Sequence, residues 1–230
     1  MDPMTNETDA RIEVPVWDWP VRFVHWAIAL LVAALITTGL IGDDMLVWHM
    51  RFGATLLALV VFRVLWGFFG SQNARFASFV RGPAAVVAYA RSLLIPPHQI
   101  HATHNPLGGW MVVALLLALL FQAGTGLFTN DDILADGPLV KHISKDLSDS
   151  ISSLHRRGWW AVAGLAGLHI VAVLSYFFVL DDNLIHPMVT GEKVLPPRVA
   201  DPAAAAASTT RAIVLLAACG AVMWWVVNRL

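Results

Sequence analysis

Five stretches of this chain are apolar over about the 20 residues that a membrane-spanning helix needs. They lie near residues 21–41, 48–69, 108–128, 153–180 and 212–228. A soluble domain carries about 25% charged residues, whereas this chain carries 13% and is 57% hydrophobic. We therefore expect an all-α integral membrane protein, in which a bundle of four helices is followed by a fifth, shorter C-terminal helix.

The polar segments divide the chain into four predicted parts. They are a polar N-terminal segment (1–16), a membrane domain (17–195), a Pro- and Ala-rich linker (196–211) and the extra C-terminal helix (212–230). The N-terminal segment lacks a basic region before the first apolar stretch, so we expect no cleavable signal peptide. Residues 74–95 are predicted to form an amphipathic surface segment, and residues 129–152 a polar loop.

Charge and cysteine content exclude several functional classes. The net charge is −1, so no basic surface for nucleic acid is expected. Cys219 is the single cysteine, which excludes an intramolecular disulfide, a cysteine-ligated iron–sulfur cluster and a zinc-thiolate site. The sequence has no C-x-x-C-H motif, so covalent attachment of a c-type haem is excluded as well.

Two histidines, His155 and His169, lie 14 residues apart in the fourth apolar stretch. This spacing is close to four helical turns, so their side chains lie within roughly 40° of each other and about 21 Å apart along the axis. His25 and His49 lie near the starts of the first two stretches. Ionisable side chains are expensive inside a membrane span, so the four histidines indicate a functional site.

The alternating direction of the spans pairs these histidines by depth. With the N-terminus inside, His25 lies near the inner end of the first span and His49 near the outer end of the second. The fourth span runs inward, so His155 lies at the outer level and His169 at the inner level. We call His25 and His169 the inner pair, and His49 and His155 the outer pair.

Paired histidines can bind zinc, copper or non-haem iron as well as haem iron. Sites for the first three usually use three or four close ligands, often with carboxylates, and the first four stretches contain no Asp or Glu. The pattern therefore favours two haem b groups, each with one axial histidine on either face. The alternative is a haem-free membrane protein in which each histidine is an ordinary interfacial residue.

Several neighbours of the four histidines are candidates to contact haem. Gly53 follows His49 by about one turn and would allow close approach of a flat ring. Arginines near the histidines could form charge-assisted contacts with haem propionates. They are Arg22, Arg51, Arg156 and Arg157. The alternative is helix packing for the glycine and anchoring at the membrane surface for the arginines.

Three further histidines, His98, His101 and His104, lie between the second and third stretches. They could group around a metal only if this segment were helical, and the prolines around them favour a loop. His104 is also a candidate to contact a quinone.

Five motifs resemble those of the bacterial cytochrome b561 family, which includes the b-type cytochrome subunits of nickel–iron hydrogenases. They are WDWPVRFVHW (17–26), WHMRFG (48–53), HNPLGGW (104–110), LHRRGWW…GLH (154–169) and HPMVTGEK (186–193). The resemblance covers roughly residues 15–195 and implies a four-helix bundle with two b-type haems. Carried over to this chain, it assigns one haem to the inner pair and one to the outer pair. The fifth stretch departs from the common four-helix members.

We therefore expect electron transfer across a bacterial inner membrane, between the quinone pool and a redox partner, with the N-terminus in the cytoplasm. The expected partners are membrane lipid, quinone and a periplasmic or membrane redox protein, such as a c-type cytochrome or a dehydrogenase or hydrogenase subunit. One alternative is a self-sufficient oxidoreductase, such as a superoxide:quinone oxidoreductase. A haem-free small membrane transporter is the alternative from another class.

Overall fold

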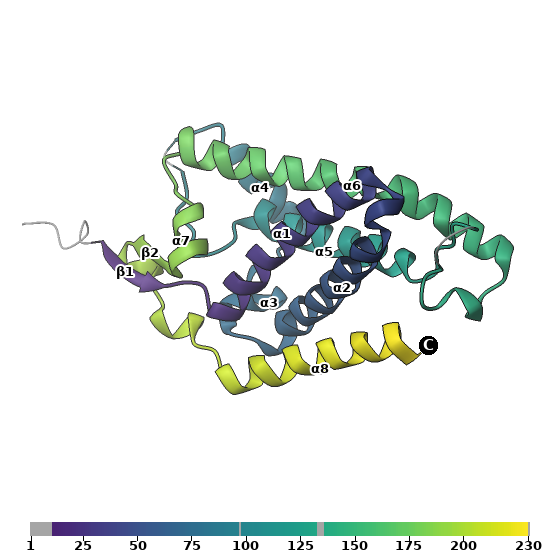
Figure 1. The fold of residues 1–230 in the computed structure, drawn as a ribbon. Coiled ribbons are helices and arrows are strands. Elements are labelled where there is room, and N and C mark those ends of the chain that lie inside the picture. The colour runs from purple at the N-terminus through teal and green to yellow at the C-terminus, as the bar shows by residue number, and fades with distance from the viewer. Residues whose placement is uncertain (1–10, 97, 133–135, 230) are drawn as a thin grey trace, which may run out of the picture. The chain divides into compact units, whose positions relative to one another are not determined.

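A computed structural model describes residues 11–96, 98–132 and 136–229 of the chain. These residues form eight α-helices and two short strands (Figure 1). The helices are α1 (Trp19–Ile41), α2 (Leu46–Phe69), α3 (Phe76–Phe79), α4 (Pro83–Ser92), α5 (Pro106–Gly126), α6 (Lys145–Phe178), α7 (Ile185–Thr190) and α8 (Thr209–Arg229). The strands are β1 (Ile12–Pro15) and β2 (Glu192–Leu195).

Among the described residues, five helices are long and apolar enough to cross a membrane. They are α1, α2, α5, α6 and α8, each of which overlaps one of the apolar stretches identified in the sequence. The prediction of an all-α protein with five spans is therefore confirmed. The helices α3 and α4 occupy the predicted surface segment, with a break at Val80–Gly82.

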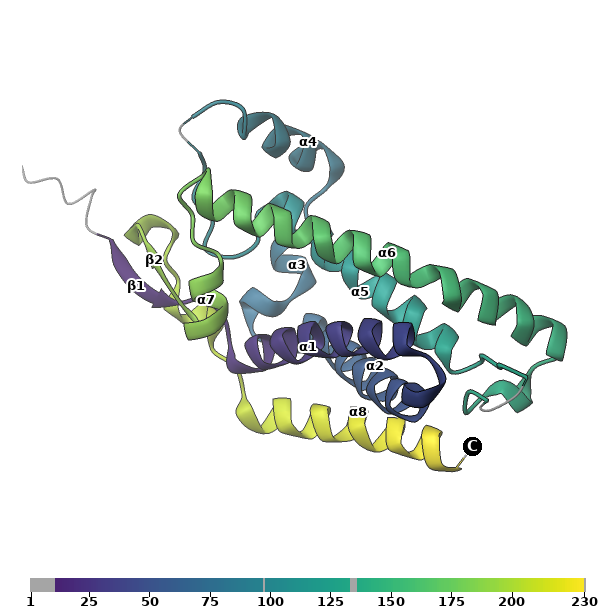
Figure 2. The same ribbon diagram turned by 45° about the horizontal axis from the view of Figure 1, so that its top comes forward.

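The chain forms two compact units, and the four histidines of the inner and outer pairs belong to the same unit. The histidine unit consists of Phe23–Leu65, Met111–Ile170 and Thr209–Leu230. It contains most of α1, α2, α5 and α6 and all of α8 (Figure 2). The strand unit consists of Met1–Arg22, Trp66–Trp110 and Val171–Ser208, and it contains both strands.

Side-chain caps define where two of the spans begin. The Oδ1 atom of Asp18 accepts a hydrogen bond of 2.8 Å from the backbone N–H of Val21, at the start of α1. The Oδ1 atom of Asn105 accepts an equivalent bond of 2.8 Å from Gly108 at the start of α5. Both caps satisfy amide groups that a helix start leaves without an intrahelical partner.

The start of α6 differs from the sequence prediction, which placed residues 129–152 in a loop. The helix begins at Lys145, because Ser144 caps it and Lys145 forms an ion pair with Asp149 one turn later. The Ser148 hydroxyl donates to the carbonyl of Phe128, which ties the preceding loop to the new helical turns. These local bonds outweigh the polar composition on which the loop prediction relied.

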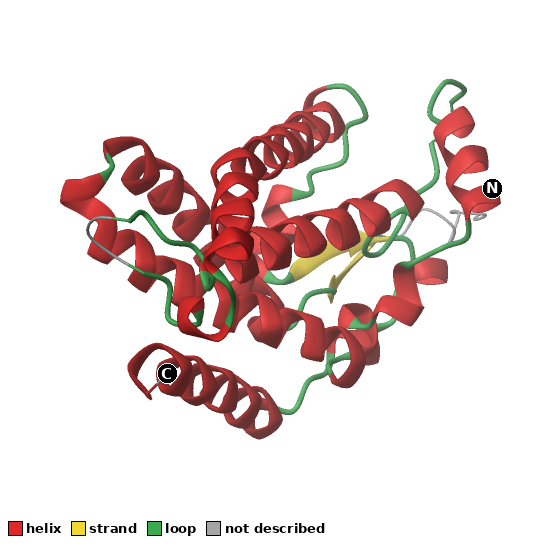
Figure 3. Ribbon diagram, turned by 90° about the vertical axis from the view of Figure 1, so that its right-hand side faces the viewer, coloured by secondary structure: helices red, strands yellow, loops and turns green. Residues whose placement is uncertain are grey.

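The strand unit contains a two-stranded antiparallel sheet that the sequence analysis did not predict (Figure 3). Val14 of β1 is opposite Lys193 of β2. The backbone N–H of Val16 donates to the carbonyl of Gly191 over 2.7 Å, and Gly191 has a φ of 95°, which favours glycine. Part of the predicted polar N-terminal segment is therefore a paired strand, while residues 1–10 lie outside the described residues.

Candidate cofactor site

The outer pair brings together side chains from α2 and α6 within the histidine unit. The ring centroids of His49 and His155 lie 6.2 Å apart, and the ring planes are at 89° to each other. Both residues are partly buried. The two histidines that the sequence assigned to one depth are therefore close neighbours in space.

The inner pair brings together side chains from α1 and α6 of the same unit. The ring centroids of His25 and His169 lie 6.3 Å apart, with an angle of 64° between the planes. Trp26 packs edge-on against the His25 ring. Among the described residues, the buried Nδ1 atom of His25 has no hydrogen-bond partner. Leaving such a group unsatisfied costs about 1–3 kcal/mol. A ligand that binds the His25 ring would offset this cost.

The separation of the rings tests whether each pair suits one metal ion. A metal–imidazole bond is about 2 Å long and a ring nitrogen lies ~1.1 Å from its centroid, so imidazoles on opposite faces of an iron have centroids about 6 Å apart. A direct hydrogen bond of about 2.9 Å between two rings would bring the centroids to about 5 Å. The observed 6.2 and 6.3 Å fit axial ligation of an ion and are too long for direct ring-to-ring hydrogen bonds.

The hydrogen bonds of His155 fix which ring nitrogen carries the proton. Its Nδ1 atom lies 2.9 Å from the backbone carbonyl oxygen of Gln122 on α5. A carbonyl oxygen can only accept, so Nδ1–H is the donor and the lone pair of the neutral ring is on Nε2. Metal-binding histidines usually donate their second ring nitrogen to a carbonyl in this way.

His49 is held in a similar way by a threonine. Its Nδ1 atom lies 3.1 Å from Oγ1 of Thr38 on α1. The Thr38 hydroxyl donates its own proton to the carbonyl of Ala34 over 2.8 Å, so it accepts from Nδ1–H of His49. Thr125 on α5 places its Oγ1 3.1 Å from Nδ1 of His155, so a threonine lies next to each ring of the outer pair. Both rings therefore keep Nε2 available for a metal.

Two glycines give the rings of the outer pair their space. A Cβ atom on Gly39 would lie 3.3 Å from Cε1 of His49, and one on Gly126 would lie 3.1 Å from Cε1 of His155. Each glycine follows the threonine that contacts the same ring, so a Thr-Gly dipeptide near the end of α1 and another at the end of α5 support the outer pair. The sequence analysis missed both dipeptides, although they are visible as TTGL and GTGL.

The candidate haem contacts occupy different environments. A Cβ atom added to Gly53 would lie 3.9 Å from a methyl group of Leu35. Arg51 is exposed and its Cζ lies 5.2 Å from the Trp48 ring centroid. Arg156 and Arg157 are exposed on α6. These residues belong to the histidine unit.

Arg22 lies in the strand unit. Its guanidinium donates to the carbonyl of Val189 over 2.7 Å and lies beside Gly191. The side chain therefore fastens the end of α7 to the start of α1. Its predicted role as a propionate contact remains a prediction.

The three histidines of the loop before α5 belong to the strand unit, and two of them pack against aromatic rings. His104 lies 4.4 Å from Phe79 and 4.8 Å from Trp17, measured between ring centroids. His101 lies 5.2 Å from the ring of Tyr89. Within the described residues, no group of three His, Cys, Asp or Glu side chains could hold a metal ion.

A polar network that sequence reasoning missed lies in the same unit. The Tyr89 and Tyr176 hydroxyls are 2.7 Å apart, and Asn105 donates to the Tyr176 hydroxyl over 2.8 Å. Burial, with the Tyr176 contact, raises the pKa of Tyr89 above its ordinary value of 10.0. Lys193 is buried and pairs with Asp182 at 2.9 Å. The bonds of Tyr176 with Tyr89 and Asn105 connect segments of the strand unit that are far apart in the sequence.

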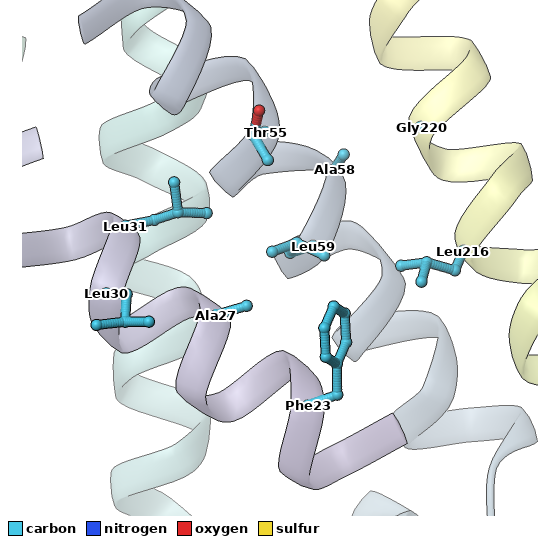
Figure 4. Close-up of a pocket in the computed structure, with 9 residues that line it drawn as sticks. All are labelled: Phe23, Ala27, Leu30, Leu31, Thr55, Ala58, Leu59, Leu216 and Gly220. Carbon is cyan, nitrogen blue, oxygen red and sulfur yellow. The ribbon is translucent and has the colours of Figure 1, made fainter. Parts of the chain in front are cut away.

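An apolar pocket of about 490 Å³ lies between α1, α2 and α8 in the histidine unit (Figure 4). Its lining comprises Phe23, Ala27, Leu30, Leu31, Thr55, Ala58, Leu59, Leu216 and Gly220. None of these nine described lining residues has a titratable side chain, and the Thr55 hydroxyl donates to the carbonyl of Arg51. At 100° per residue, the α1 residues of the pocket lie at least about 120° around the helix from His25. The pocket therefore lies on the side of α1 away from His25.

The fold and the site define a class of protein: a multi-pass helical membrane protein with facing histidine pairs at two levels, a class that includes b-type membrane cytochromes. A comparison with protein families gives the particular group. Residues 16–191 match the family model described as prokaryotic cytochrome b561. The chain belongs to this family and is a membrane cytochrome. The match confirms the resemblance seen in the sequence motifs. Membership of this family implies haem b and electron transfer.

Curated relatives give the same result at low identity. A probable Ni/Fe-hydrogenase B-type cytochrome subunit of Bradyrhizobium diazoefficiens is 24% identical, with coverage of 80% of this chain and 87% of the relative. A probable Ni/Fe-hydrogenase 1 B-type cytochrome subunit of Escherichia coli is 22% identical, with coverage of 82% and 94%. A probable Ni/Fe-hydrogenase B-type cytochrome subunit of Rhodobacter capsulatus is 23% identical, with coverage of 80% of this chain and 82% of the relative. No solved structure gave a significant match.

Proposed function

We propose that this protein is a di-haem b-type cytochrome that carries electrons across the membrane between the quinone pool and a redox partner. The inner pair is assigned as the axial ligands of one haem b and the outer pair as those of the other. The observation that carries the proposal is the spacing of both pairs, 6.3 and 6.2 Å between ring centroids, which suits an iron between each two rings.

The residues around the outer pair support this assignment. The Gln122 carbonyl and the Thr38 hydroxyl hold the Nδ1 protons of His155 and His49, which presents Nε2 of each ring as the ligand atom. Haem iron supplies one-electron redox chemistry when bound. The protein fixes the ligands and excludes water, and it sets the potential through burial and nearby charge.

The two pairs give the electron a route through the membrane. His155 and His169 are separated by about 21 Å along α6, from the helical rise per residue. Irons held by the two pairs would therefore lie at two depths in the membrane. One site near each surface suits exchange with a membrane quinone on one side and a protein partner on the other.

The names of the relatives support the choice of protein partner. Their names describe subunits of Ni/Fe hydrogenases, so we assign a hydrogenase or a comparable dehydrogenase as the protein partner, with a c-type cytochrome as the alternative. We place the chain in the bacterial inner membrane with the N-terminus in the cytoplasm. The inner pair then faces the cytoplasmic half and the outer pair the periplasmic half.

The exposed arginines favour a second candidate, a self-sufficient superoxide:quinone oxidoreductase. Arg51 and Arg156 are each two residues or fewer from a histidine of the outer pair, and Arg157 is next to Arg156. Exposed cations attract a small anion such as superoxide, which would give up one electron and leave as dioxygen. Reduction of the purified protein by superoxide, without a protein partner, would favour this candidate.

The proposed cofactor content is tested by a haem count on the purified membrane protein. We expect two haem b groups per chain from the pyridine haemochrome spectrum, and complete removal of haem by acid–acetone. A count near one, or haem that stays with the polypeptide, would contradict the assignment. No haem at all would favour the transporter alternative.

A further inference from the structure

Arg63 is a cation placed on the histidine-bearing side of α2. It follows His49 by 14 residues, the same spacing that separates His155 from His169 on α6. In a helix this spacing corresponds to about 21 Å along the axis and an angular offset of roughly 40°. Arg63 therefore lies on nearly the same side of α2 as His49, at the level that the inner pair occupies.

The surroundings of Arg63 agree with this placement. The residue is only 7% exposed, and it belongs to the same compact unit as both histidines of the inner pair. Arg63 lies six residues before the end of α2, or about 9 Å along the axis. The protein covers the side chain, so it does not reach water by extending along the helix as a membrane-surface anchor would.

A buried cation at this position has a consequence for redox chemistry. Arginine stays protonated under all ordinary conditions, and a charge inside a membrane span is costly enough to indicate a function. Reduction of a haem adds one negative charge. A buried cation close to a haem therefore stabilises its reduced form and raises its reduction potential.

The cations near the outer pair are different. Arg51, Arg156 and Arg157 are exposed, so water and salt screen their charges. Both pairs are bis-histidine sites in the proposed assignment, so ligand identity does not separate their potentials. The two potentials are instead separated by the contrast between a buried cation at the inner level and exposed cations at the outer level.

We propose that Arg63 sets the reduction potential of the haem at the inner pair above that of the haem at the outer pair, which directs electrons from the outer to the inner level. This inference rests on the proposed di-haem function. The transfer moves one electron and no proton, and the outer haem is oxidised as the inner haem is reduced. The electron donor is then the protein partner at the outer surface, and the acceptor is a quinone at the inner one.

The size of the effect follows from the distance and the dielectric. Unit charges on the order of 10 Å apart, at an effective dielectric constant of about 20, change an equilibrium constant roughly tenfold. The reduced-to-oxidised ratio of the inner haem should therefore change about tenfold at a fixed potential, which corresponds to ~59 mV for a one-electron couple.

The test is a spectroelectrochemical titration of the purified full-length protein in lipid nanodiscs. Arg63→Met removes the charge and keeps a long side chain, whereas Arg63→Lys keeps the charge. Arg91→Met is the control, because it removes an exposed arginine that lies in α4, outside the helices that carry the histidine pairs. The inner haem is identified as the component that is lost in His169→Ala.

We expect Arg63→Met to lower the reduction potential of the inner component, so that its reduced-to-oxidised ratio at a fixed potential falls about tenfold. Arg63→Lys should retain most of the wild-type potential. Arg91→Met should change both components less than twofold. An unchanged inner component in Arg63→Met with two haems present would overturn the proposal, and so would a shift confined to the outer component. Loss of the inner haem in Arg63→Met and in Arg63→Gln would show a structural role and also overturn it. A wild-type protein with fewer than two haems would instead contradict the proposed function.

Discussion

The Thr38 hydroxyl lies 3.1 Å from Nδ1 of His49 and donates its own proton to the carbonyl of Ala34. The pair of contacts makes Thr38 an acceptor for the histidine and leaves Nε2 free. A threonine on α1 thus orients a histidine on α2. Removing a hydrogen bond that orients a metal-binding histidine typically changes metal affinity 10–100-fold.

The first prediction is that Thr38→Val weakens haem binding at the outer pair. Valine keeps the shape of threonine but cannot accept the Nδ1 proton, so the imidazole loses its fixed orientation. We expect about tenfold faster loss of the outer haem to apomyoglobin, measured by absorption. Thr37→Val is the matched control, because the exposed Thr37 hydroxyl donates to the Ala33 carbonyl of its own helix. Equal loss rates in the two variants would contradict the proposed role of Thr38.

A second prediction concerns the space that Gly126 leaves for His155. A Cβ atom at this position lies 3.1 Å from Cε1 of the ring, which is tighter than ordinary contact, and the branches of valine add further atoms. Gly126→Val should therefore displace His155 and lower the occupancy of the outer haem by at least about half, because the axial bond requires a fixed ring. Haem content is read from the reduced spectrum.

Gly124→Val is the control for this substitution. Gly124 lies on the same helix, and an added Cβ there meets no atom within 4 Å among the described residues. Both variants place a β-branched residue in α5, so the helix-propensity cost is shared. Similar haem contents in the two variants would show that the contact with His155 is unimportant.

The third prediction is that single histidine variants separate the two haems. His25→Ala and His169→Ala should each remove the inner spectral component, whereas His49→Ala and His155→Ala should each remove the outer one. Each loss should halve the haem content and lower the melting temperature, because bound cofactor stabilises the folded state. Loss of the same component in His25→Ala and His155→Ala would contradict the pairing.

The spans and the grouping of the four histidines were predictable from the sequence, because both depend on local patterns. Apolar length identifies a span, and the 14-residue spacing places His155 and His169 on one side of α6. Alternating chain direction then suffices to match His25 with His169. In the structure the ring centroids of this pair lie 6.3 Å apart.

Other features were not predictable, because they depend on contacts between distant segments. The hydrogen bond between His155 and Gln122 joins residues 33 positions apart, and no local pattern marks Gln122 as its partner. The pairing of Val14 with Lys193 is a longer case. The early start of α6 had a local signal in Ser144, but the polar composition of the segment hid it.

The fourth prediction is a pH dependence of stability that arises from His101 in the strand unit. Burial, followed by the charge of Lys193, lowers the pKa of His101 below 6.5, against the opposing effect of Asp182. The unfolded chain then binds a proton more readily than the folded one. His101 therefore contributes no penalty well above pH 6.5, and it reduces stability as the pH falls through that value.

Melting temperature measured between about pH 8 and pH 5 tests this effect. We expect the decrease towards low pH to be smaller in His101→Phe, which keeps a ring against Tyr89 but cannot be protonated. Tyr89, Lys193 and Asp182 are unchanged in this variant and contribute equally to both curves. His142→Phe, at an exposed position, is the control and should follow the wild-type curve. A parallel decrease in wild type and His101→Phe would rule out the contribution.

The fifth prediction is that α8 is dispensable for haem binding. Its residues Leu216 and Gly220 line the apolar pocket, which lies on the side of α1 away from His25. A chain that ends after Ser208 should keep two haems and an unchanged reduced spectrum, with lower thermal stability because Ala212 and Cys219 are buried. An end after Lys193 is a poorer choice, because it removes Leu195 from β2, whose side chain is fully buried. That shorter chain should lose more stability than the first, and loss of either haem after truncation at Ser208 would place α8 in the haem-binding core.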